Sequence, residues 1–133
     1  MIGIDTNVLV RVLVDDKQAA SQCHKARALL RAHNKIFIST IVLTETVWVL
    51  QRAYGVDKND TVNLLDRLLI QKAIVFENRP LLETAIDIYR KGTSGFSDAL
   101  ILAAHHAKAC RLYTFDKKLA RHESVTDLSG MAL

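Results

Sequence analysis

Short apolar runs and longer amphipathic stretches alternate along the chain. Apolar runs of three or four residues are typical of buried strands and occur at residues 2–4, 36–38, 73–76 and 112–115. A further run at residues 124–126 predicts an edge strand. Because the intervening stretches carry apolar residues at helical spacing, the pattern predicts strands that alternate with helices. Such alternation is typical of an α/β fold, a parallel sheet with helices on both faces.

Capping residues mark where the predicted helices begin and end. Ser39 or Thr40 can cap a helix that ends near Tyr54. Gly55 follows at once, and glycine is favoured just past a helix end. The remaining predicted helices show similar signals and cover residues 17–33, 57–69, 80–91, 98–104 and 117–120. Residues 8–14 form an apolar run that is rich in β-branched side chains.

The composition is ordinary for a globular protein. The 133 residues are enough for one core, and we expect a single domain over residues 1–133. No stretch approaches the ~18 continuous apolar residues of a membrane span. Since the first strand begins at Met1, we expect no signal peptide and a cytoplasmic protein. Cys23 and Cys110 match no metal or redox spacing, so we expect two small buried side chains.

The charge balance is basic. Lys and Arg outnumber Asp and Glu by 18 to 14, which gives a net charge of +4. One basic group surrounds an acid near the carboxyl end of the chain and comprises Arg111, Lys117, Lys118 and Arg121. Such groups are often solvated helix faces, but they also attract nucleic acid.

Four carboxylates occupy equivalent places in this pattern: Asp5, Glu45, Asp98 and Asp116. Two of them follow apolar strands, and two lie in the first turns of apolar helices, the second of which Ser97 can cap. Buried acids are costly unless they are paired or hold a metal. A parallel α/β sheet builds its ligand crevice outside the carboxyl ends of its strands. We therefore expect the four acids, here called the quartet, to converge in that crevice.

The quartet has the ligand type that Mg²⁺ and Mn²⁺ prefer. Without a metal, clustered carboxylates repel one another, whereas a bound metal makes its water a better nucleophile. The residues therefore predict a metal-dependent enzyme. Taken singly, Asp5 or Asp116 could cap a turn, and Glu45 could pair with a buried base. Asp98 could be favoured by the helix dipole alone.

Four segments carry these acids in a fixed order. They read Asp5-Thr6-Asn7-Val8-Leu9, Ile41-Val42-Leu43-Thr44-Glu45, Phe96-Ser97-Asp98-Ala99-Leu100-Ile101 and Thr114-Phe115-Asp116-Lys117-Lys118-Leu119. Their order and spacing, with the chain length, resemble PIN-domain ribonucleases of the VapC type, the toxins of bacterial toxin–antitoxin pairs. The resemblance implies a three-layer α/β/α domain with a central parallel sheet. It also implies an endoribonuclease that uses Mg²⁺ or Mn²⁺, with the quartet as catalytic and metal-binding residues.

The same resemblance assigns supporting roles and partners. Polar residues beside the acids, Thr6, Asn7 and Thr114, would orient the ligands, and three basic residues, Lys117, Lys118 and Arg121, could hold RNA phosphates. The chain would form a homodimer or a hetero-oligomer with a small antitoxin, which would insert residues near the acidic site.

Two other readings remain open at this point. Residues 2–8 resemble the nucleophile strand of haloacid-dehalogenase-type phosphatases, although those enzymes need an acid where this chain has Asn7. A nonenzymatic PIN-like module that binds RNA or a protein partner is the second. The complete quartet argues against it, because degenerate members would be expected to lose acids.

Overall fold

A computed structural model describes all 133 residues, Met1–Leu133. The chain forms two compact units, unit 1 over Met1–Arg79 and unit 2 over Pro80–Leu133. No helix is long and apolar enough to cross a membrane.

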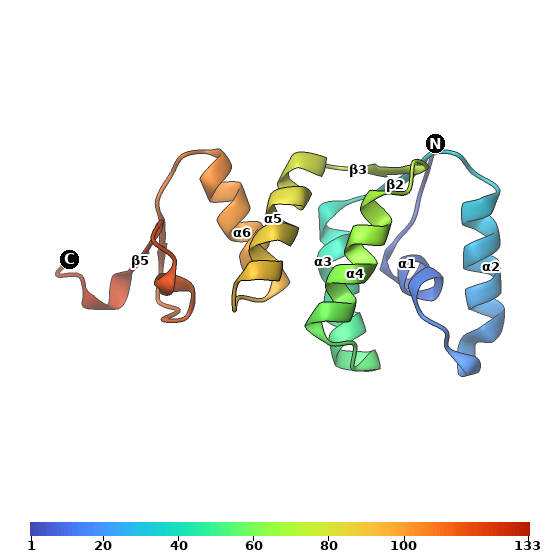
Figure 1. The fold of residues 1–133 in the computed structure, drawn as a ribbon, viewed down its shortest axis with the longest axis horizontal. Coiled ribbons are helices and arrows are strands. Elements are labelled where there is room, and N and C mark those ends of the chain that lie inside the picture. Colours follow the sequence, from blue (N-terminus) through green and yellow to red (C-terminus); the bar gives the residue numbers. More distant parts are fainter. The chain divides into compact units, whose positions relative to one another are not determined.

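Unit 1 contains a parallel three-stranded sheet and four α-helices (Figure 1). The strands, in the order β1-β2-β3, are β1 (Ile2–Gly3), β2 (Ile36–Ile38) and β3 (Ile74–Phe76). The α-helices are α1 (Thr6–Leu13), α2 (Ala20–Arg31), α3 (Thr40–Tyr54) and α4 (Lys58–Leu69), with a 3₁₀ turn, η1 (Lys17–Ala19), before α2. Leu9, Ile38 and Leu50 are fully buried and belong to the core of this unit.

Capping chemistry explains the helix ends of unit 1. The Ser39 hydroxyl accepts the Val42 N–H at the start of α3 (3.3 Å), and Gly55 ends this helix with φ 61°. The Asp57 carboxylate accepts the Asp60 N–H (2.8 Å) and starts α4. The helices predicted to start near Thr40 and Asp57 are confirmed with their boundaries. The helix predicted over residues 17–33 is instead the 3₁₀ turn η1 followed by α2, which ends at Arg31. The β-branched run at residues 8–14 falls largely within α1, because burial of its apolar face outweighs the weak helix propensity of valine.

Unit 2 holds a pair of helices and a parallel two-stranded sheet (Figure 1). The strands are β4 (Leu112–Thr114) and β5 (Val125–Asp127), and the α-helices are α5 (Arg79–Lys91), whose first residue closes unit 1, and α6 (Phe96–Ala107). Two 3₁₀ turns, η2 (Leu119–Arg121) and η3 (Leu128–Gly130), complete it. Tyr89 and Phe96 join α5 to α6 through an edge-to-face contact with ring centroids 5.6 Å apart.

A small apolar cluster holds the second half of unit 2 together. Leu102 of α6, Leu119 of η2 and Val125 of β5 are its buried members. The predicted short helix after the strand at 112–115 is the turn η2, and the edge strand near 124–126 is β5.

The α/β class with parallel strands is confirmed, and the single domain over residues 1–133 stays a prediction. One smaller expectation is wrong. Cys23 is buried, but Cys110 is exposed, because it lies in the turn after α6, next to Ala109 with φ 52°.

Candidate active site

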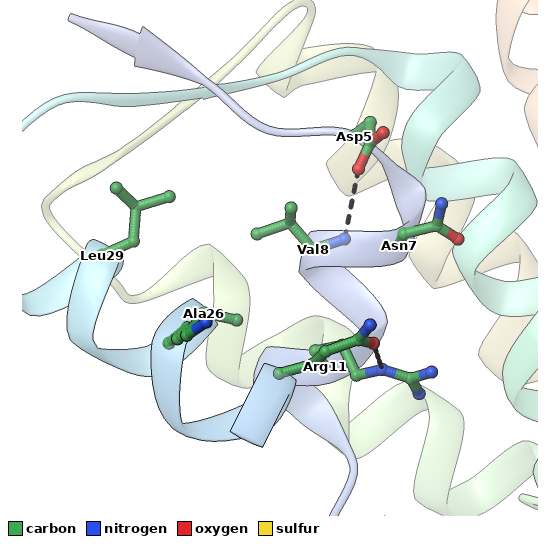
Figure 2. A pocket seen from close by; sticks show the side chains of 8 residues that line it. Asp5, Asn7, Val8, Arg11, Ala26 and Leu29 are labelled. Atoms are coloured by element: carbon green, nitrogen blue, oxygen red, sulfur yellow. Dashed lines mark hydrogen bonds between the residues drawn. The ribbon is translucent and has the colours of Figure 1, made fainter. Parts of the chain in front are cut away.

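Asp5 begins the site in unit 1. It lies two residues beyond the end of β1 and is the N-cap of α1, where its Oδ1 accepts the Val8 N–H at 3.2 Å (Figure 2). The second oxygen, Oδ2, has no hydrogen-bond partner in the protein. A carboxylate has lone pairs for several partners, so capping leaves Asp5 able to bind a cation.

Glu45 lies on the second turn of α3, which starts directly after β2. Its side chain is exposed and makes no ion pair, so the alternative of a buried base beside Glu45 is not borne out. β1 and β2 are parallel, with Gly3 opposite Phe37. The chain segments that carry Asp5 and Glu45 therefore leave the same edge of the sheet.

A third acid at this edge escaped the sequence reasoning. Glu77 follows β3, and its Oε1 accepts the Thr40 N–H at 2.9 Å. An acid at a helix N-terminus stabilises the unpaired N–H groups there. Glu77 thus caps α3, and only its place directly after an apolar strand could have drawn attention to it.

An open pocket of about 620 Å³ adjoins Asp5, between α1 and α2. Figure 2 shows Asp5 and Asn7 at the amino end of α1, with Ala26 and Leu29 on α2 across the pocket. The basic residues Arg11 and Lys25 also line it, and Arg11 Nε donates to Gln22 Oε1 at 2.8 Å. The pocket therefore combines an acid, two amides and two cations. Thr6 is half-buried beside Asp5. Its predicted role in orienting the metal ligands stays a prediction.

Unit 2 carries the other two acids. Asp98 lies in the first turn of α6 and is half-buried. Gly95, rather than Ser97, is the N-cap of this helix, so the predicted cap is wrong by two residues. The helix begins earlier because Phe96 is buried against Tyr89 and is drawn into the first turn.

Asp116 follows β4 by two residues, as Asp5 follows β1. Its Oδ1 accepts the N–H groups of Lys118 (2.8 Å) and Leu119 (3.1 Å) and so caps the turn that leads into η2. The Thr114 hydroxyl accepts the Asp116 N–H at 3.0 Å. Thr114 therefore holds the backbone of this acid in place.

The basic residues beside Asp116 are all exposed: Lys117, Lys118 and Arg121. Hydrogen bonds from Ser129 lower the pKa of the nearby Asp127, and the charge of Lys117 lowers it further. Lys117 thus lies near Asp127 as well as next to Asp116.

A contact between Ser94 and His122 in unit 2 was not predicted from the sequence. Ser94, in the loop before α6, lies with its Oγ 3.3 Å from Nε2 of His122, which ends η2. Ser94 is buried, and the hydrogen bond of the His122 ring runs from Nε2 to Ser94, with no carboxylate in an ion pair with the ring. The pair is therefore not a catalytic triad.

The structure divides the quartet, with Asp5 and Glu45 in unit 1 and Asp98 and Asp116 in unit 2. In neither unit do three or more His, Cys, Asp or Glu side chains form a group that could hold a metal ion. The expectation that the acids are buried is wrong, because three of them are exposed and Asp98 is half-buried. Each follows a strand or lies on an outer helix face, which leaves its carboxylate accessible to a ligand.

Comparisons with known proteins address the family. The PIN domain family matches residues 2–124. No curated protein matches the chain. Among solved structures, the chain is similar to Mycobacterium tuberculosis VapC20, a Sarcin-Ricin loop cleaving toxin, with 20% identity, a TM-score of 0.44, and 91% of this chain and 94% of the other covered.

It is also similar to a chain of a toxin–antitoxin complex from Klebsiella pneumoniae, with 19% identity, a TM-score of 0.36, and 94% of each chain covered. These TM-scores are low, so the family rests on the sequence match, which spans both units. The predicted resemblance to PIN-domain proteins is confirmed: the chain belongs to the PIN-domain family.

Proposed function

We propose that this protein is a Mg²⁺- or Mn²⁺-dependent endoribonuclease that acts in the cytoplasm as the toxin of a toxin–antitoxin pair. One observation carries the proposal. Each unit presents two accessible acids, and Asp5 and Asp116 follow parallel strands by the same two-residue offset. The PIN-domain match covers both units, which supports one functional domain over residues 1–133.

Asp5 and Asp116 each follow a parallel strand by two residues, and a parallel α/β sheet binds its ligands outside the carboxyl ends of its strands. The proposal therefore assigns both acids to the metal site.

The donor set fits a hard cation. All four side chains offer carboxylate oxygens, and no member is tied up in an ion pair. When bound, Mg²⁺ or Mn²⁺ supplies a water of lowered pKa and positive charge that stabilises the phosphate in hydrolysis. Asp5, Glu45, Asp98 and Asp116 would hold it.

Other residues would position the RNA and the acids. Lys117, Lys118 and Arg121 lie beside Asp116 and offer positive charge to flanking phosphates, which gives affinity with little sequence choice. Thr114 holds the Asp116 backbone through its hydroxyl. Asn7 stands with Asp5 at the pocket on α1, where a nucleotide could enter, and Thr6 lies between them in the chain.

The antitoxin and the assembly follow from the resemblance to VapC-type toxins. A nuclease with an open site needs control by a partner, and a small antitoxin would cover the acids. An exposed apolar face of α3, with Ile41 and Trp48 on either side of Glu45, is suited to such a partner or to a second copy in a homodimer.

The direct test incubates the purified chain with RNA and Mn²⁺, with EDTA as the control. We expect cleavage with Mn²⁺ or Mg²⁺ and none with EDTA. A metal-dependent phosphatase activity without RNA cleavage, or RNA binding without cleavage, would contradict the nuclease.

The toxin role is tested in cells. Induction of the wild-type chain should arrest growth, whereas Asp5→Ala at the same protein level should not. Equal growth of both strains would contradict the toxin role while leaving the RNA cleavage assay to decide the nuclease.

A further inference from the structure

A polar contact in unit 2 joins the two segments that carry Asp98 and Asp116. Ser94 Oγ and Nε2 of His122 are 3.3 Å apart, although the residues are separated by 28 positions in the chain. Ser94 is only 4% exposed, so its hydroxyl has little access to water. A buried hydroxyl without a partner is costly, which makes this contact a stable feature of the unit.

On one side, short-range hydrogen bonds connect His122 to Asp116. The Asp116 carbonyl accepts the Ala120 N–H at 3.0 Å, and its Oδ1 accepts the Leu119 N–H at 3.1 Å. The His122 N–H then donates to the Leu119 carbonyl at 3.3 Å. A shift of His122 would therefore be transmitted to the Asp116 carboxylate through a single short turn.

On the other side, Ser94 directly precedes the first turn of α6. Gly95 is the N-cap, and its carbonyl accepts the Ala99 N–H at 3.0 Å, which closes the turn that contains Asp98. The His122 ring also lies against Gly92, where an added Cβ would be 4.0 Å from ring atom Cε1 and 3.1 Å from the Ile88 carbonyl oxygen. The loop before α6 therefore passes next to this ring.

Apolar packing also holds the segment that carries Asp98 against the segment that carries Asp116, but it does not fix how the two segments are oriented. Leu102, Leu119 and Val125 bring α6, η2 and β5 together. Hydrophobic contact is non-directional, whereas a hydrogen bond weakens steeply when its angle changes. The Ser94–His122 contact is therefore the part of the junction that is sensitive to the alignment of the two segments.

We propose that the hydrogen bond between Ser94 and His122 is a positioning link that aligns Asp98 with Asp116. The inference rests on the proposed function, because alignment of these acids matters only if they act together. Neither residue touches the RNA in this account. Loss of the link should lower kcat, because the acids are misplaced, and leave KM for RNA nearly unchanged, because the basic residues remain.

The test uses Ser94→Ala, His122→Ala and the double variant that carries both changes. A fourth variant, His122→Gln, keeps a side-chain amide that can form a hydrogen bond with the serine hydroxyl. Ser124→Ala, an exposed serine near His122, is the matched control. Cleavage of one RNA with Mn²⁺ is measured well below each melting temperature. Amide hydrogen exchange is followed at Ala99, Leu119 and Ala120.

We expect both alanine variants to lower kcat about tenfold to a hundredfold, with KM within about twofold. The double variant should be no slower than the slower single variant, because both remove the same link. His122→Gln should recover most of the rate, and Ser124→Ala should match the wild type. Exchange at the three amides should be faster in the alanine variants only.

Wild-type kcat in either alanine variant would overturn the link while leaving the proposed nuclease intact. Additive losses in the double variant would overturn it as well. If the wild type itself fails to cleave RNA, the proposed function fails, and hydrogen exchange alone decides the link. Unchanged exchange at all three amides would then overturn it.

Discussion

Two carboxylate groups of the quartet cap helical turns and also have an oxygen free for a metal ion. Asp5 and Asp116 each use Oδ1 to cap a helical turn, and no protein group bonds Oδ2. Each of these two carboxylates can therefore cap a helical turn with one oxygen and bind a metal ion with the other. Substitution can separate the two roles, because asparagine caps a helix as well as aspartate but is a weaker ligand for a hard cation.

Asp5→Asn should keep the fold and lose metal-dependent RNA cleavage by at least about 100-fold, the range expected when a metal site is impaired. Asp57→Asn is the matched control, since Asp57 caps α4 of the same unit and lies outside the quartet. Initial rates with Mn²⁺ and melting temperatures provide the measurement. Wild-type rates in Asp5→Asn would remove this residue from the site.

Asp16 allows a test of how the stability of the protein depends on pH. The hydroxyl of Tyr54 donates to its Oδ2 at 2.8 Å and, with the Gln18 N–H, lowers the pKa of this carboxyl below the ordinary 3.8. A lowered carboxyl pKa stabilises the fold above the ordinary value, and this contribution is lost as the pH falls through the folded pKa. Tyr54→Phe should therefore lower the free energy of unfolding more at pH 7 than at pH 3.

Urea unfolding at both pH values measures this difference. Tyr113→Phe, at an exposed tyrosine, is the control and should change little at either pH. An equal loss of stability in Tyr54→Phe at pH 7 and pH 3 would show that the Asp16 charge is not involved.

At Thr46 we expect a substitution that stabilises the protein. Its hydroxyl is buried in α3 and has no hydrogen-bond partner. Thr46→Val removes an unsatisfied group with little change in shape and should raise the free energy of unfolding by about 1 kcal/mol. Thr44→Val in the same helix should not, because the Thr44 hydroxyl donates to the Thr40 carbonyl at 3.0 Å. Destabilisation by Thr46→Val would point to a partner for this hydroxyl in solution.

At the scale of elements, local sequence signals had the most predictive power. The caps Ser39 and Asp57 and the stop at Gly55 act over a few residues, so they could be read directly from the chain. α1 was harder, because its valines favour strands, and the Asp5 cap and the burial of Leu9 and Val10 make it a helix. Gly95 starts α6 before the expected Ser97 because Phe96 packs on Tyr89, a contact that no local pattern reveals.

Gly55 tests the element-scale account. Its φ of 61° is a left-handed conformation that favours glycine, and an alanine there should lower the free energy of unfolding by about 1 kcal/mol. Gly130→Ala is the control, because an added Cβ at Gly130 meets nothing within 4 Å and its φ is not left-handed. Equal stabilities of the two variants in urea would contradict this description of the end of α3.

At the scale of the whole molecule, the sequence could predict the family more readily than the packing of distant residues. The order of the four motifs predicts the PIN-domain family, and the family match over residues 2–124 confirms it, while the roles of the four acids stay a prediction. Long-range contacts such as Ser94 with His122 left no sequence signal, because neither residue lies in a recognisable pattern. Burial was misjudged for the same reason, since it depends on how the elements pack. The central claim of the proposed function is that the quartet binds a divalent metal ion.

Calorimetric titration with Mn²⁺, in the presence of a noncleavable RNA, tests this claim most directly. One acid from each unit is changed, Asp5→Asn in unit 1 and Asp98→Asn in unit 2, with Asp57→Asn as the control. The account predicts that the wild type and the control bind Mn²⁺ alike and that each quartet variant binds at least about tenfold more weakly. Wild-type affinity in either quartet variant, or no binding by the wild type, would contradict the proposal that the quartet binds the metal ion.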